Sequence, residues 1–97
     1  MKITIETDKS ATDIMRRAGY GLLGKDADTG EISFVKRAGG GDYPRFHTYV
    51  KKEDKIITVN LHLDQKRPSY AGSHVHNAEY ENPLLEQEAL LIKKSVA

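Results

Sequence analysis

RFHTYVKKEDKIITVNLHLD, residues 45–64, is the stretch that decides the fold. Apolar and polar side chains alternate on both sides of its charged centre, which is typical of two β-strands that each bury one side and expose the other. The side chains predicted to face the core are Phe46, Thr48, Val50, Ile57, Val59, Leu61 and Leu63. The stretch therefore predicts an antiparallel hairpin with one apolar and one polar face.

The charged centre predicts a hairpin turn at Glu53-Asp54, or an even-length loop centred there. That register keeps every apolar residue on one face, which a slip of one residue would not do. It pairs Val50 with Ile57, Thr48 with Val59, Phe46 with Leu61, Tyr49 with Thr58, His47 with Asn60 and Arg45 with His62. His47 and His62 then become diagonal neighbours on the polar face, roughly 7–8 Å apart between backbones.

The flanking sequence predicts the other elements. Ser10 and Asp13 resemble a capping box at the start of a helix over 11–18, and Gly19 suits the end of that helix. EISFVKR, residues 31–37, reads as a third strand, and residues 1–6 alternate as a short edge strand. Asn82 and Pro83 predict the start of a C-terminal amphipathic helix, after a polar connection over 65–81.

These elements predict one small α+β domain over residues 1–97. The expected architecture is helix, three-stranded antiparallel sheet, helix, with a short N-terminal edge strand and both helices on the apolar face of the sheet. A hydrophobic fraction of 38% and a charged fraction of 30% suit a soluble domain with a thin core.

Composition excludes some functions and weakens others. The chain has no cysteine, so disulfides and thiolate metal sites are excluded. Its N-terminus lacks the apolar core of a signal peptide, and no stretch is long enough to cross a bilayer, so we expect a cytoplasmic protein without a membrane partner. The net charge of +1 provides no overall attraction for nucleic acid, although residues 36–67 hold eight basic and four acidic side chains.

The histidines suggest two kinds of site, a metal site and a nuclease site, and the sequence supports both only weakly. His62 and Asp64 on one strand, with His74 and His76 beyond it, offer four metal ligands, but their spacing is not diagnostic, and no metal or other cofactor is predicted. The HVH sequence at 74–76, with Tyr80 after it, matches the motif of rolling-circle nucleases. It lies in a predicted loop, however, and not on a central strand.

The third kind of site is one that cleaves RNA by acid–base catalysis. A histidine exchanges a proton near neutral pH, and an arginine stabilises a developing phosphorane. The candidate catalytic residues are His47, Arg45 and His62, and the candidate RNA-binding residues are Lys36, Arg37, Lys51, Lys66 and Arg67. An ordinary half-exposed strand histidine is the alternative interpretation of His47.

A family resemblance points in the same direction. IMRRAGYGLLG, YPRFHTYV and IITVNLH resemble the first helix and the second and third strands of HicA-like toxins, which are mRNA interferases with the element order of double-stranded-RNA-binding domains. The resemblance implies that His47 takes the place of the catalytic histidine. LHLDQKRPSY, followed by EYE, also resembles a group of small bacterial proteins of unknown function.

Two functional classes are compatible with this sequence. One is an RNA-interacting domain that cleaves RNA without a metal through His47. The other is a non-enzymatic module that binds a protein through the open sheet face or the 65–81 loop, or that pairs with a second copy through its edge strand. The sequence does not decide whether the protein is an enzyme.

Overall fold

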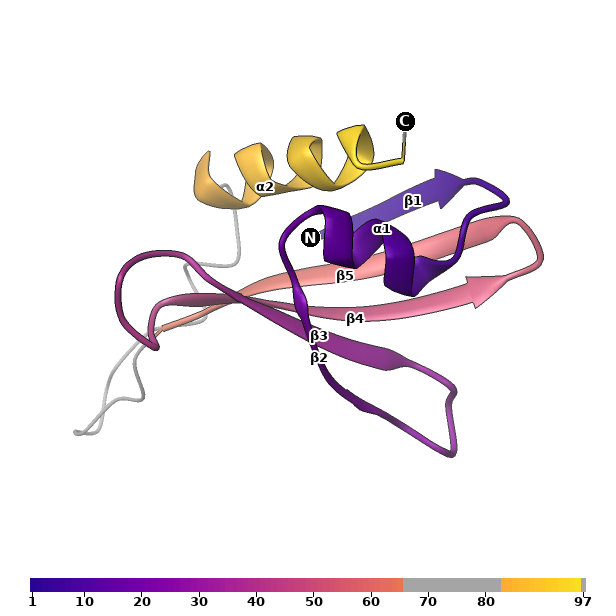
Figure 1. Cartoon of the computed structure of the whole chain (residues 1–97), viewed down its shortest axis with the longest axis horizontal. Helices are drawn as coiled ribbons and strands as arrows, with labels where there is room; N and C mark the ends of the chain where they lie inside the picture. The colour runs from indigo at the N-terminus through magenta and orange to yellow at the C-terminus, as the bar shows by residue number, and fades with distance from the viewer. Residues whose placement is uncertain (66–82, 97) are drawn as a thin grey trace.

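The computed structural model describes residues 1–65 and 83–96 and shows a five-stranded antiparallel sheet with two helices on one face (Figure 1). The elements in chain order are β1 (Lys2–Glu6), α1 (Ala11–Arg17), β2 (Gly21–Lys25), β3 (Ile32–Arg37), β4 (Arg45–Glu53), β5 (Ile56–Asp64) and α2 (Pro83–Lys94). The strands lie in the order β1-β5-β4-β3-β2. The chain is therefore of the α+β class.

The predicted three-stranded sheet is wrong. Besides the three expected strands, β1 pairs with β5 and β2 pairs with β3, so the chain order is strand, helix, four strands, helix, and not the order of a double-stranded-RNA-binding domain. β2 escaped prediction because its sequence, GLLGK, has two glycines and no alternation. All five of its residues are exposed, and it is held in place by pairing with β3.

The predicted register of the hairpin is also wrong, by two residues. Glu53 pairs with Ile56, so the turn consists of Asp54 and Lys55, and Asp54 has a φ of 55°. The faces are unchanged, because a shift of two keeps the pleat in phase. The observed pairs are Val50 with Val59, Thr48 with Leu61, Phe46 with Leu63, Tyr49 with Asn60, His47 with His62 and Arg45 with Asp64.

The two residues predicted to flank the first helix, Ser10 and Gly19, lie at the two ends of α1. The Ser10 side chain accepts a hydrogen bond from the backbone N–H of Asp13 at 3.0 Å, which satisfies one free donor of the first turn. Gly19 follows the helix with a φ of 96°, a conformation that costs little only for glycine. The cap predicted at Asn82 lies outside the described residues, while α2 begins at Pro83.

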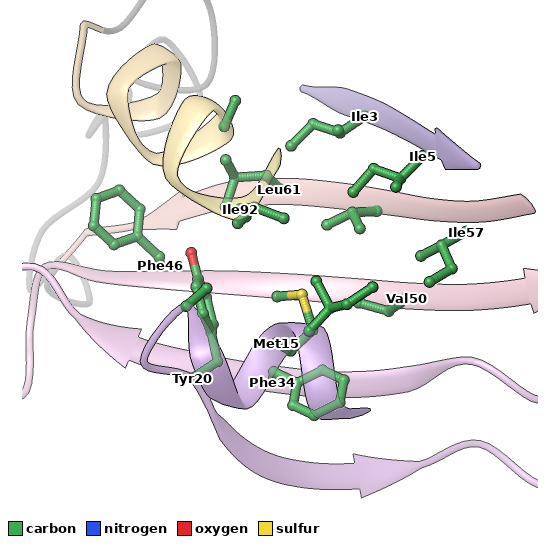
Figure 2. Packing of buried hydrophobic residues seen from close by; sticks show 14 of the residues in the cluster. Ile3, Ile5, Met15, Tyr20, Phe34, Phe46, Val50, Ile57, Leu61 and Ile92 are labelled. Carbon is green, nitrogen blue, oxygen red and sulfur yellow. The ribbon is translucent and has the colours of Figure 1, made fainter. Parts of the chain in front are cut away.

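The core lies between the helices and the sheet (Figure 2). Met15 from α1, Phe34 from β3 and Leu85 from α2 are fully buried there, together with the inward side chains of β4 and β5. Since each such side chain contributes about 1.5–3 kcal/mol by leaving water, this face fixes the sheet under the helices. The opposite face of β4 and β5 is left for polar side chains.

A charged pair joins α2 to the sheet at the edge of this core. The Lys36 ammonium lies 2.6 Å from a carboxylate oxygen of Glu88 and donates to the carbonyl of Ala18 at 3.0 Å. It also lies 5.5 Å from the centre of the Tyr20 ring. Burial, together with the nearby Glu88 carboxylate, raises the pKa of the Tyr20 hydroxyl well above its ordinary value. Tyr20 is therefore a neutral neighbour of this pair.

Within the described residues, neither helix has the length and apolar character needed to span a bilayer.

Candidate functional site

Five side chains from β4 and β5 gather on the sheet face that the helices leave uncovered. We call them the polar cluster: Arg45, His47, Tyr49, His62 and Asp64. Strict alternation along both strands sends them to the same side. The register then places His47 directly opposite His62 and Arg45 directly opposite Asp64. The hairpin thus brings together all three candidate catalytic residues.

Asp64 is the centre of the cluster. One of its carboxylate oxygens, Oδ2, lies 3.1 Å from Nδ1 of His47 and 3.4 Å from Nε of Arg45. Because an ionised carboxylate only accepts hydrogen bonds, the proton of a neutral His47 ring belongs on Nδ1, and Nε2 keeps its lone pair. Asp64 therefore orients the imidazole and holds a guanidinium beside it.

Tyr49 packs on the histidines. Its ring stacks on His47 with the centroids 4.5 Å apart and an angle of 28° between the planes, and it meets His62 edge-on at 6.0 Å. The His47 side chain is only 13% exposed, and its Nε2 is buried without a hydrogen-bond partner among the described residues. Tyr49 is 37% exposed. A substrate can therefore reach Nε2 only if the cluster opens, and Tyr49 is the most exposed residue of the cluster.

A pocket of about 540 Å³ adjoins the cluster at Arg45. Its lining includes the basic residues Lys36, Arg37 and Arg45, and also Tyr43, whose ring centre lies 4.9 Å from the Arg45 guanidinium carbon. Tyr43 is 41% exposed. Asp42 also lines the pocket and pairs with Arg37, so the pocket places paired charges and an accessible tyrosine beside Arg45 of the polar cluster.

The predicted RNA-binding residues do not form one surface. Lys36 belongs to the helix-covered side, where Glu88 neutralises it. Arg37 is 67% exposed and pairs with Asp42 at 3.1 Å, while Lys51 is 46% exposed and pairs with Glu53 at 3.4 Å. Lys66 and Arg67 lie outside the described residues. Among the predicted RNA-binding residues that the structure describes, Arg37 and Lys51 are therefore the accessible cations.

Within residues 1–65 and 83–96, no three histidine, aspartate or glutamate side chains are grouped so that they could hold a metal ion. The proposed pairing of His62 and Asp64 with His74 and His76 cannot be followed, because the latter two lie outside these ranges. The HVH sequence and Tyr80 lie outside them too.

Two functional features escaped the sequence-based interpretation. The sequence suggests Asp64 only as a metal ligand, because the expected register places Arg45 opposite His62 and leaves Asp64 without a partner on β4. The alternation predicts the correct face for Tyr49 but indicates no role for it. The alternation predicts the face on which both residues lie. The correct position of the turn would also have predicted their cross-strand partners.

The chain matches no protein-family model, no curated protein and no solved structure. A functional assignment therefore depends on the geometry of the polar cluster.

Proposed function

We propose that the protein binds RNA at the polar cluster and cleaves it without a metal ion, with His47 as the principal acid–base residue. The observation that supports this proposal best is the shared carboxylate of Asp64, which contacts both His47 and Arg45. Histidine oriented by a carboxylate is a recurrent general base, and a neighbouring arginine suits a phosphate. The resemblance of YPRFHTYV, which contains His47, to a strand of HicA-like interferases suggests the same class of reaction, and it rests on this local sequence and not on the element order.

The proposed reaction uses the 2′-hydroxyl of RNA as its nucleophile. Nε2 of His47 takes the hydroxyl proton while the 2′-oxygen bonds to the adjacent phosphorus. The bond from phosphorus to the 5′-oxygen breaks, and protonated His62 donates a proton to that oxygen. Arg45 stabilises the additional negative charge on the phosphorane. The products are a 2′,3′-cyclic phosphate and a free 5′-hydroxyl.

Binding precedes this step and opens the cluster. Single-stranded RNA is usually recognised by stacking of unpaired bases on aromatic rings and by cations that contact phosphates. Tyr49 and Tyr43 supply exposed rings, and Arg37 and Lys51 supply accessible cations. In the proposed complex, Tyr49 turns from His47 to a base and so gives the 2′-hydroxyl access to Nε2.

The test is incubation of the purified protein with single-stranded RNA in EDTA. We expect fragments that end in 2′,3′-cyclic phosphates. His47→Ala should slow the cleavage by about 10²–10⁴-fold, the usual contribution of general acid–base catalysis. Asp64→Asn should slow it as well, because the amide no longer fixes the ring tautomer. The matched control is Thr58→Ala, an outward-facing β5 position outside the cluster.

Binding is measured separately with a 2′-deoxy oligonucleotide, which the proposed reaction cannot cleave. If the RNA is bound but stays intact, the protein is an RNA-binding domain and not a nuclease. RNA that is neither bound nor cleaved would reject the proposal in favour of a protein-interaction module. Cleavage that persists in His47→Ala would reject the assigned base.

A further inference from the structure

The two edges of the sheet differ in how well they can pair with another strand. β2 forms one edge, and its pairing with β3 is interrupted by a bulge between Leu22 and Gly24. Bulges of this kind protect an edge from further pairing. β1 forms the other edge, and its five residues pair with β5 in unbroken register. Within the described part of the chain, no strand lies beyond β1.

Hydrogen bonds on either side of β1 show which of its backbone groups point outward. Met1 and Leu61 exchange backbone hydrogen bonds, and the N–H of Thr7 donates to the carbonyl of Lys55. Because such pairs recur at every second residue of an antiparallel ladder, the odd-numbered residues of β1 bond to β5. The N–H and C=O groups of Lys2, Thr4 and Glu6 therefore point to the free edge.

We propose that two copies of the protein pair through β1 in an antiparallel, two-fold symmetric register centred on Thr4. In this register Thr4 faces Thr4 of the second copy, and Lys2 faces Glu6. All three outward-pointing residues then exchange backbone hydrogen bonds with the other strand, six bonds in total by the pattern of such ladders. Other two-fold registers leave part of this set unpaired.

Charge complementarity specifies a second copy as the partner. Lys2 and Glu6 are exposed, and neither forms an ion pair with any other described residue. Edge lysines commonly prevent pairing, but here each would meet an opposite charge, and symmetry produces that contact twice. A strand that carries Lys2 at one end and Glu6 at the other is thus complementary to itself.

The side chains between these charges suit the same arrangement. Ile3 and Ile5 point to the helix-covered side, where they are 3% and 8% exposed. In the proposed register Ile3 faces Ile5 of the second copy, so the apolar layer continues across the axis. The result is one ten-stranded sheet with both polar clusters on the same face. Five strand spacings separate the two β4 strands, about 24 Å across the sheet.

The test measures self-association by sedimentation velocity over a range of protein concentrations. We expect a monomer–dimer equilibrium that Thr4→Pro abolishes, since proline removes the central outward N–H. Proline at this position removes no bond to β5, so circular dichroism should show an intact fold. Thr4→Val, which keeps the N–H, is the matched control and should still dimerise.

Charge reversal provides a second test that does not depend on proline. Lys2→Glu alone and Glu6→Lys alone should each weaken self-association about ten-fold, because like charges then face each other. The double variant should restore it. An equimolar mixture of the two single variants should form heterodimers, because each Glu then faces a Lys.

Several results would overturn the proposal. A protein that stays monomeric at every concentration has no such interface. A dimer that withstands both Thr4→Pro and charge reversal uses another surface. Association that continues beyond two copies indicates head-to-tail pairing and not a closed two-fold contact.

Discussion

Glu88 and Lys36 form an ion pair at the edge of the core that a single substitution can break. Glu88→Gln leaves the ammonium of Lys36 without its carboxylate in a side chain that is 23% exposed. We expect a loss of about 3 kcal/mol, at the low end for a broken buried pair because Ala18 still accepts from the ammonium. For a domain of this size, thermal unfolding monitored by circular dichroism should shift down by more than about 10 °C.

The double variant Lys36→Met with Glu88→Leu is the control for this prediction. Apolar residues of similar volume often replace a buried ion pair without loss, so the double variant should unfold within about 1 kcal/mol of the native protein. If it loses as much as Glu88→Gln, the pair contributes packing that methionine and leucine do not reproduce, and the electrostatic explanation fails.

Single residues also show which contacts could be predicted from the sequence. Alternation was sufficient to place Arg45, His47 and His62 on one face, because the side-chain period of a strand is two. It could not select the partner of each residue, since registers that differ by two residues bury the same side chains. The ion pair between Lys36 and Glu88 could not be predicted from sequence patterns, because the two residues lie 52 positions apart in the chain.

At the scale of elements, the position of the β4–β5 turn determines which residues of β4 and β5 pair with each other. Asp54 is its first residue and has a φ of 55°, which glycine adopts with less strain. Asp54→Gly should therefore raise the free energy of unfolding by up to about 1 kcal/mol. Lys55→Gly should lower it, because Lys55 lies outside the positive-φ region. Urea unfolding of both variants measures the difference, and equal effects would show that turn strain is unimportant.

β2 shows why an element can be missed altogether. Sequence patterns reveal a strand when one side is buried, and β2 buries neither side: Leu22 is 64% exposed and Leu23 is 55% exposed. β1, which buries Ile3 and Ile5, was visible as a short alternation in the same sequence. The covered part of the sheet was therefore predictable from side chains, whereas β2, with all five residues exposed, is recognised by its backbone pairing with β3.

At the scale of the whole molecule, the number of phosphate contacts decides how strongly salt should influence RNA binding. Each phosphate contact with a single strand contributes about −0.7 to the slope of log affinity against log salt concentration. If Arg37, Arg45 and Lys51 make the contacts, the slope should be about −2. Contacts from Lys66 and Arg67 as well would bring it to about −3.5.

Fluorescence anisotropy with a labelled 2′-deoxy oligonucleotide, at several salt concentrations, measures this slope. Arg37→Ala should make it shallower by about 0.7, because one phosphate contact is lost, and Lys25→Ala, a control in the exposed β2 edge, should leave it unchanged. A slope near zero would mean that the oligonucleotide contacts no cation of the protein. In that case the polar cluster would not be a nucleic-acid site, and the orientation of His47 by Asp64 would be a feature of sheet packing alone.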